Sequence, residues 1–347
     1  MLKKILLSFV ILIIVFISQS SHAQYWHRLP KVEACDRSLS PGFSNDEKKV
    51  FYIAPDSLGI KNVFAVDLKG GAPMQITRSA TPVVRLMHVY GRPLIIYMKA
   101  VGKGTTDYHL YRANNNGTDE LDLTPTGEGV RNEMLGSSFN GRFMYYAANK
   151  QNKAKIDYFG YDILQNLSET VFVNEKDADL LAWSRDQKRL IMQDPATTTV
   201  WNYDINSTDR NQLYAPIAPK KVKQAMLSAD NKTLYVLEAD GANTELRSIK
   251  MTSPTEIGDE VVPIAAGIAT IDISVNGKFL ITTKGDHTTM RDLTTLEAVY
   301  SPADPIIDLQ TNSKETLVLQ TVSTANGRSL QVYDLAKKTT VTLVTVK

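Results

Sequence analysis

The fold is decided by a stretch that reads Trp183-Ser184-Arg185-Asp186-Gln187-Lys188-Arg189-Leu190-Ile191-Met192 and continues, after a gap, as Val200-Trp201-Asn202-Tyr203-Asp204-Ile205. Apolar runs flank a short polar turn, and the last run ends in an acid followed by one more apolar residue. This pattern predicts strand, tight turn, strand, loop and strand. Variants of it recur along the chain, and recurrence at a fixed period is the signature of a repeat architecture.

The repeat is written Ser-x-(Asp/Asn)-x-(Lys/Arg)-x-hydrophobic. Clear copies begin at Ser138, Ser184, Ser228 and Ser274, with weaker copies at Ser44 and Gln310 and the poorest at His88. Successive copies start 44 to 50 residues apart, except for the last interval of 36. A four-stranded propeller blade takes about 40–45 residues. The spacing therefore predicts seven blades.

A second mark runs in phase with the first. The third strand of five units ends in an acid: Val66-Asp67-Leu68, Tyr161-Asp162-Ile163, Tyr203-Asp204-Ile205, Arg291-Asp292-Leu293 and Tyr333-Asp334-Leu335. An Asp at a strand end accepts hydrogen bonds from N–H groups of the following turn, so we interpret these acids as structural and not as metal ligands. Asn-Gly at 140–141 and 276–277 favours two-residue hairpins. Together the marks predict an all-β, seven-bladed β-propeller of four-stranded antiparallel blades.

The repeated turn followed by strand, loop, strand and Asp-Leu resembles the WD-like repeats of TolB-type propellers. It is also similar to the propeller domain of prolyl-oligopeptidase-type peptidases. The resemblance covers about residues 38–346 and implies a propeller and its blade pattern, with little information on activity. Seven units depart from the six expected of TolB proper, and the peptidases' catalytic domain has no counterpart in the sequence.

The N-terminus has the pattern of an export signal. Lys3 and Lys4 precede an apolar run from Ile5 to about Ile17, and a small-residue site ends at Ala23. These features predict a signal peptide over residues 1–23 and a periplasmic or secreted protein. An uncleaved anchor is the rival reading, but the run is shorter than the ~20 residues of a spanning helix. Residues 24–347 are expected to form one propeller domain, with 24–37 as a lead or closing segment.

Charge and cysteine content exclude several classes. Removing residues 1–23 takes away two lysines and no acid, so the formal net charge falls from +2 to 0. This balance argues against nucleic-acid binding, which needs a clustered basic face. Cys35 is the only cysteine, so no internal disulfide forms. We expect no cofactor.

Binding is better supported than catalysis. The chain has no Gly-x-Ser-x-Gly, His-Glu-x-x-His or Gly-x-x-x-x-Gly-Lys motif. In a propeller the innermost strand of each blade lines the channel, and six charged residues fall on those predicted strands: Arg85, Glu133, Asp179, Lys223, Asp272 and Asp308. Converging mixed charges suit a polar ligand or a partner's loop, whereas solvation of a wet channel is the plainer interpretation.

We therefore expect a non-catalytic module that binds a protein or envelope component. The alternative is a metal-dependent propeller enzyme of the lyase, cyclase or lactonase type, with histidines gathered at the channel: His27, His88, His109 and His287. Carbohydrate binding is a third possibility, with Tyr25 and Trp26 as rim aromatics. Ring closure stays open between strand exchange through the lead and simple packing.

Overall fold

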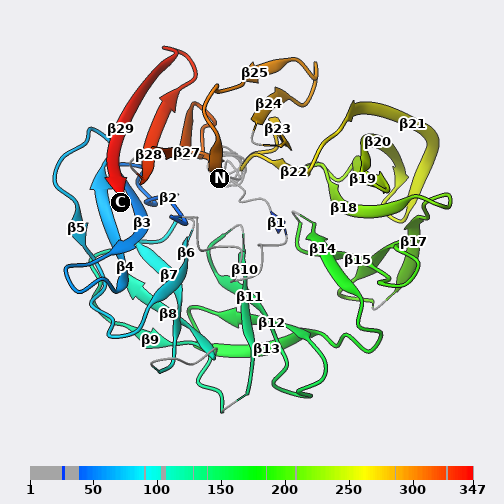
Figure 1. The fold of residues 1–347 in the computed structure, drawn as a ribbon. Coiled ribbons are helices and arrows are strands. Elements are labelled where there is room, and N and C mark those ends of the chain that lie inside the picture. The colour runs from blue at the N-terminus through cyan, green and yellow to red at the C-terminus, as the bar shows by residue number, and fades with distance from the viewer. Residues whose placement is uncertain are drawn as a thin grey trace, which may run out of the picture.

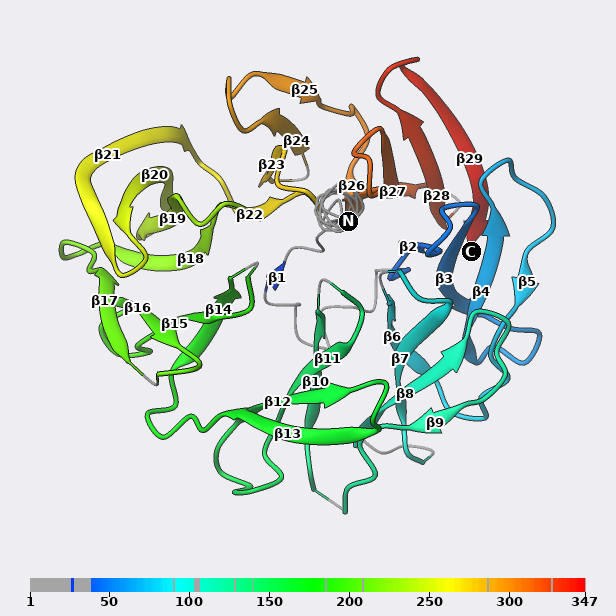
Figure 2. The ribbon, with the colours of Figure 1, turned by 180° about the vertical axis from the view of Figure 1, so that it is seen from behind.

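The computed structural model describes residues 26–27 and 39–346, apart from positions 90, 103–106, 128, 139, 185, 208, 286 and 326. The predicted signal peptide, Tyr25 and Cys35 lie outside the described residues. Within them the chain forms strands and no helix, arranged as seven sheets around a centre (Figures 1 and 2). No helix there is long and apolar enough to cross a membrane. The predicted all-β, seven-bladed propeller is confirmed.

Each blade is a meander of four consecutive antiparallel strands. Blades one to three are β2 (Gly42–Phe43), β3 (Lys49–Pro55), β4 (Lys61–Asp67) and β5 (Met74–Gln75); β6 (Val83–His88), β7 (Leu94–Ala100), β8 (Tyr108–Asn114) and β9 (Leu121–Asp122); β10 (Asn132–Ser137), β11 (Phe143–Ala148), β12 (Asp157–Asp162) and β13 (Leu167–Phe172). Blades four and five are β14 (Asp179–Trp183), β15 (Arg189–Gln193), β16 (Val200–Asp204) and β17 (Arg210–Tyr214); β18 (Lys221–Leu227), β19 (Thr233–Asp240), β20 (Asn243–Ser253) and β21 (Glu256–Ala266). Blades six and seven are β22 (Thr270–Ile273), β23 (Phe279–Lys284), β24 (His287–Asp292) and β25 (Ala298–Tyr300); β26 (Ile306–Thr311), β27 (Leu317–Thr324), β28 (Gly327–Asp334) and β29 (Thr339–Val346).

The repeated serine builds the turn between the first and second strands. In blade five the Ser228 N–H donates to the Thr233 carbonyl at 2.7 Å, and the Ser228 hydroxyl accepts from the Thr233 N–H at 2.9 Å. The same hydroxyl donates to Asp230 at 2.6 Å, which fixes the acid of the motif. The loop spans residues 229–232, and the same backbone bond joins Ser138 to Phe143 and Ser274 to Phe279, so the two-residue hairpins predicted at Asn-Gly are wrong. Asn231, with φ 58°, supplies the left-handed residue that closes this longer loop.

The same backbone bond corrects the alignment of two units. It joins Val89 to the Leu94 carbonyl and Asn312 to the Leu317 carbonyl, each at 3.0 Å. The anchors are therefore Val89 and Asn312, and the predicted anchors His88 and Gln310 lie on the preceding strands. Neither unit has a serine to mark the turn, and in blade seven the Asn312 amide oxygen takes over by accepting from the Leu317 N–H at 2.9 Å.

The strand-end acids have the structural role predicted for them. Asp204 Oδ1 accepts from the Asn206 and Ser207 N–H groups at 2.8 and 3.0 Å. The carboxylates of Asp67, Asp162, Asp292 and Asp334 accept from the turns that follow them in the same way. Each acid thereby ends its strand and starts the turn to the outer strand.

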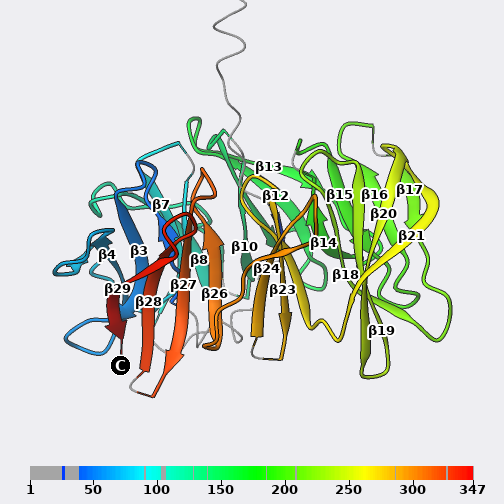
Figure 3. The same cartoon turned by 90° about the horizontal axis from the view of Figure 1, so that it is seen from above.

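The apolar core lies between blades and not at the hub. Each pair of neighbouring blades shares a cluster of buried side chains, such as the Trp183 and Tyr145 rings, whose centroids are 4.3 Å apart across blades three and four. The apolar residues directly before four of the serine turns are buried: Phe43, Trp183, Leu227 and Ile273. Blade-to-blade burial of this kind fixes the ring as one rigid disc, seen edge-on in Figure 3.

The ring closes by packing and side-chain hydrogen bonds. All four strands of the seventh blade come from residues 306–346, so no strand is exchanged with the first blade. Apolar residues of both blades form one cluster that includes Phe43, Leu330 and Leu343. Across the seam, Glu47 accepts from the Ser313 N–H at 2.6 Å. Of the two predicted modes of closure, packing is the one observed.

The N-terminal lead makes a contact that the sequence did not predict. β1 (Trp26–His27) pairs antiparallel with β14, with Trp26 opposite Trp183 and His27 opposite Ala182. β14 is the innermost strand of blade four, so β1 lies at the centre of the ring (Figure 1). Through these two residues the lead adds a fifth strand to blade four.

Candidate functional site

The six charged residues predicted for the channel lie on the first strands of six successive blades, which face the centre of the ring (Figure 1). They are Arg85 on β6, Glu133 on β10, Asp179 on β14, Lys223 on β18, Asp272 on β22 and Asp308 on β26. Their environments differ, because Arg85 is buried whereas Glu133 and Lys223 are exposed. The innermost strands therefore carry charges of both signs, and a channel-binding role for these residues stays a prediction.

Local irregularity of the inner strands sets how these residues stand. The pairing of β18 with β19 passes from Val222 to Gln224, so Lys223 is the extra residue of a β-bulge. The inner strands of blades two, three, four and seven carry comparable register shifts. Bulges re-aim side chains and increase twist. Side chains on these inner strands therefore do not alternate strictly between the two faces of the sheet.

Asp308 and Asp272 each accept a hydrogen bond from a backbone N–H group. Asp308 Oδ2 accepts from the Leu39 N–H at 3.3 Å, which joins blade seven to the segment that leads into blade one. Asp272 Oδ1 accepts from the Ile273 N–H at 2.6 Å. Asp308 therefore contributes to the seam of the ring in addition to lining the wall.

The inner edge of blade four shows what the channel wall accepts. β14 uses one edge to pair with β15, and its other edge faces the channel. Trp26 and His27 pair with that second edge through their backbone. A strand edge offers N–H and C=O groups to any extended segment of matching register. Strand addition to an inner edge is thus an observed interaction of this channel, and it was missed because two residues give no periodicity to read.

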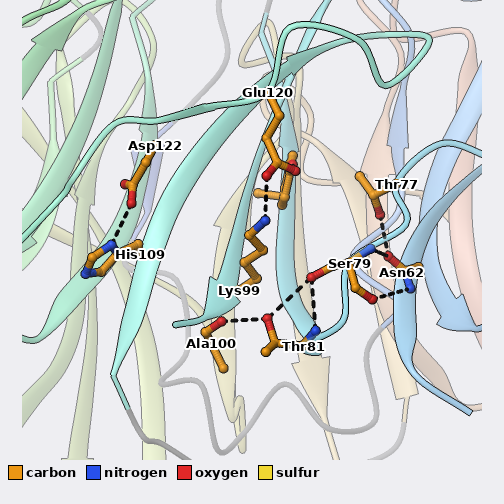
Figure 4. Close-up of polar contacts among 10 residues, drawn as sticks. Asn62, Thr77, Ser79, Thr81, Lys99, Ala100, His109, Glu120 and Asp122 are labelled. Atoms are coloured by element: carbon orange, nitrogen blue, oxygen red, sulfur yellow. Dashed lines mark hydrogen bonds and ion pairs between the residues drawn. The ribbon is translucent and has the colours of Figure 1, made fainter. Parts of the chain in front are cut away.

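The histidines do not form the metal centre of the enzymatic alternative within the described residues, where no three His, Cys, Asp or Glu are placed to hold a metal ion. His109 is buried, and its Nδ1 lies 2.7 Å from Asp122 Oδ2 while its Nε2 lies 3.4 Å from the Thr126 hydroxyl (Figure 4). His287 is exposed on β24. The side chains of His27 and His88 lie outside the described residues, as does that of Trp26.

Polar side chains that the sequence did not single out fasten blade two. Lys99 Nζ lies 2.6 Å from Glu120 Oε1, and the Tyr97 hydroxyl donates to the other oxygen of Glu120 (Figure 4). Burial opposes ionisation of Glu120, but the hydrogen bonds from Lys99 and Tyr97 outweigh it and lower the pKa of the carboxyl. Burial raises the pKa of Tyr97, so its hydroxyl stays a donor. These contacts join β7 to the segment before β9.

A second network ties blade one to blade two. Asn62 Oδ1 accepts from the Thr77 hydroxyl and the Ser79 N–H, both at 2.8 Å. The Thr81 hydroxyl then donates to the Ala100 carbonyl of blade two at 2.6 Å (Figure 4). Every hydrogen bond of this network is made within the segment that joins blade one to blade two or with one of those two blades. We therefore assign the network to the scaffold and not to a ligand site.

Comparison with known proteins agrees with this architecture. Residues 14–155 match the family model described as the dipeptidyl peptidase IV N-terminal region. No curated protein sequence matches the chain. An oligogalacturonate lyase in complex with manganese superposes with a TM-score of 0.65 at 9% identity, covering 90% of this chain and 89% of that one.

Two other solved structures complete the comparison. A puromycin-hydrolysing peptidase from Mycobacterium tuberculosis gives a TM-score of 0.63 at 11% identity, covering 93% of this chain but 56% of the peptidase. TolB from Acinetobacter baumannii gives 0.50 at 10% identity, covering 82% of this chain and 75% of TolB. Likeness at such low identity establishes the fold and not the activity. The chain is therefore a seven-bladed β-propeller that shares its fold with TolB, with an oligogalacturonate lyase and with part of a peptidase.

Proposed function

We propose that this protein is exported and acts as a non-catalytic β-propeller that binds an envelope protein. The partner supplies an extended segment, which pairs with an inner blade edge in the channel. The observation that carries the proposal is the pairing of β1 with β14, in which the channel wall holds an extended stretch of polypeptide by its backbone.

Strand addition suits this wall for a physical reason. Backbone hydrogen bonds supply affinity along a sheet edge, and alternate side chains of the added strand supply specificity. The rigid disc holds the edges of the inner strands in place. Binding therefore costs conformational entropy mainly in the bound segment and little in the propeller. Glu133 is exposed on β10, and β10 also lies near β1.

Export is the second part of the proposal. It rests on the basic start, the apolar run and the small-residue site before Gln24. Periplasmic or secreted protein is expected to begin at Gln24, which N-terminal sequencing of protein from fractionated cells tests. A mature protein that retains residues 1–23 in the membrane fraction would contradict this part.

Site-specific photo-crosslinking in intact cells tests the binding surface. A photoreactive amino acid at Glu133, on an inner strand, is expected to capture one envelope protein. The same group at Val341, 45% exposed on the outer strand β29, is the matched control and is expected to capture none. Equal capture at both positions would refute channel binding.

Metal analysis separates this function from the enzymatic alternative. Purified protein is expected to contain no stoichiometric metal after dialysis against a weak chelator. One tightly bound metal ion per chain, lost on substitution of a channel histidine or carboxylate, would favour the lyase-like alternative.

A further inference from the structure

A cavity of about 410 Å³ opens at one end of blade five, beside the start of its innermost strand β18. It lies around the tip of the β19–β20 hairpin, between Lys220 before β18 and Gly267 after β21. Its lining includes three acids and one base: Glu238, Asp240, Glu245 and Lys220. Neither the predicted channel residues nor the proposed function involves this cavity.

Two of the acids stand side by side because of strand register. Glu238 on β19 pairs directly with Glu245 on β20. Carboxylates in directly opposed positions repel one another, so their pairing destabilises a sheet unless cations lie close. Here Arg247 donates to Glu245 Oε2 at 2.6 Å, and Lys220 Nζ lies 3.5 Å from an oxygen of each acid. The positive charges of Arg247 and Lys220 thus offset the repulsion between the two carboxylates.

Glu238 is the least exposed acid of the cavity, with 2% of its side chain accessible to solvent. Its Oε1 accepts from the Tyr214 hydroxyl of blade four at 2.7 Å. Its Oε2 lies 3.2 Å from Arg247 Nε, yet it receives no hydrogen bond from any residue that the structure describes. A buried carboxylate oxygen without a donor costs free energy. An N–H donor that enters the cavity would remove this cost.

Charge decides the class of ligand. Arg247 and Lys220 neutralise the opposed pair, and Asp240 is an exposed third acid at the hairpin tip. The cavity therefore has an excess of negative charge together with an oxygen that lacks a donor. We propose that it binds a primary ammonium or guanidinium group, with Glu238 and Asp240 as the groups that recognise the cation.

Cavity size agrees with such a ligand, since pockets for small molecules span about 300–1,000 Å³. Three alanines and a glycine of the lining provide a surface for an alkyl stem, beside the polar Asn243 and Thr244: Ala239, Ala242, Ala266 and Gly267. A lysine or arginine side chain of a protein and a free alkyl diamine present the same chemistry. The site is therefore defined by the cation, and the experiment has to distinguish the two sources.

Calorimetric titration of the mature protein tests the site with three probes: N-acetyl-lysine methylamide, 1,5-diaminopentane and the uncharged N-acetyl-norleucine methylamide. The lysine derivative represents a peptide side chain, and the diamine represents a free metabolite. At least one of the two cations is expected to bind with one site per chain, and the norleucine derivative is expected not to bind. Binding of the diamine alone assigns the site to a free amine.

Matched variants locate the binding. Glu238→Gln is expected to weaken binding roughly tenfold or more, the scale for neutralising a charged hydrogen-bond partner. Asp240→Asn at the exposed hairpin tip should also weaken it, and serves if Glu238→Gln fails to fold. Glu256→Gln, at an exposed position of β21 outside the cavity lining, should leave affinity unchanged. The proposal is overturned if neither cation binds, if acetate binds in their place, or if the folded cavity variants bind as tightly as Glu256→Gln.

Discussion

Glu47 of the first blade accepts a hydrogen bond from the side chain of Asn312 of the last blade, with 3.1 Å between Oε2 and Nδ2. The contact repeats one made a blade earlier, where Glu315 accepts from the Ser274 hydroxyl and from the Asn276 N–H. Each glutamate follows its own anchor by three residues and reaches back to the turn of the preceding blade. The seam of the ring is therefore held by a contact that is also used inside the ring.

Replacing Glu47 by alanine should weaken the seam. Two hydrogen bonds to the half-buried carboxylate are lost, and each contributes about 1 kcal/mol net. We expect a loss of about 2 kcal/mol in the free energy of unfolding, measured by urea denaturation. Glu47 has φ 52°, a backbone conformation that glycine adopts without strain. Glu47→Gly therefore removes the same hydrogen bonds as Glu47→Ala while it relieves the backbone strain, and a comparison of the two variants separates the two contributions. Unchanged stability in both variants would show that apolar packing alone closes the ring.

Gly277 sets how closely the turns of blades five and six approach. A Cβ there would lie 2.3 Å from the Ala229 Cβ, and its φ of +76° is unfavourable for other residues. Gly277→Ala should therefore cost about 3 kcal/mol, from strain of about 1 and overpacking of about 2. Gly285→Ala is the matched control, since its φ is +59° and no atom lies within 4 Å of the added Cβ. Thermal denaturation of both variants should reveal a clear gap, and equal losses would exclude the steric contribution.

Ser228 and Asp230 should behave as one unit in stability measurements. The Ser228 hydroxyl accepts from the Lys232 and Thr233 N–H groups and donates to Asp230, so Ser228→Ala removes the link between acid and backbone. We expect a loss of about 1–2 kcal/mol. Because Asp230→Ala breaks the same network, the double variant should lose less than the sum of the single variants. Strict additivity would contradict the shared role.

Acid should destabilise the protein through the strand-end aspartates. Backbone N–H groups of Ser207 and Asn206 lower the pKa of Asp204 below its ordinary value of 3.8, and N–H groups of Thr294 and Thr295 do the same for Asp292. The unfolded chain therefore binds more protons near pH 4 than the folded protein does. This stability is present above about pH 4 and is lost as the pH falls through the lowered pKa values.

Urea denaturation at pH 7 and at pH 3 tests the acid effect. The wild type should lose stability between the two, and the double variant Asp204→Asn, Asp292→Asn should lose less over the same interval. An identical pH dependence in the two proteins would show that other carboxyls control acid unfolding.

Much of the fold was legible in the sequence because the turns carry chemistry that a packed strand does not. The serine hydroxyl accepts two backbone hydrogen bonds in its turn, and the acid accepts backbone hydrogen bonds where a strand ends, as in Ser228 and Asp204. Both residue types therefore recur at a fixed spacing that can be recognised in the sequence. The alignment failed at Val89 and Asn312, where other residues occupy the serine position. The loop length was also predicted wrongly, because an Asn-Gly pair indicates the positive φ angles of a turn but does not determine the number of residues in the loop.

The sites were harder to predict, since they depend on register between strands. The inner strands were located correctly, and Arg85 and its five counterparts lie on them. A binding role for these residues stays a prediction. The pairing of β1 with β14 joins residues more than 150 positions apart and has no local signal. In blade five, Glu238 ends the otherwise apolar run Leu234–Leu237 and precedes a hairpin turn. A buried acid at that position was a detectable anomaly, but its partner Tyr214 belongs to another blade.

Since the four core strands of every blade come from one continuous piece of chain, with β1 added only to blade four, the architecture does not impose the order in which the blades follow one another along the chain. No segment has to be threaded through a neighbour for the circle to hold, and the junction between residues 39 and 346 is one more side-by-side contact. A protein rewired to begin at another blade would therefore retain the contacts between neighbouring blades.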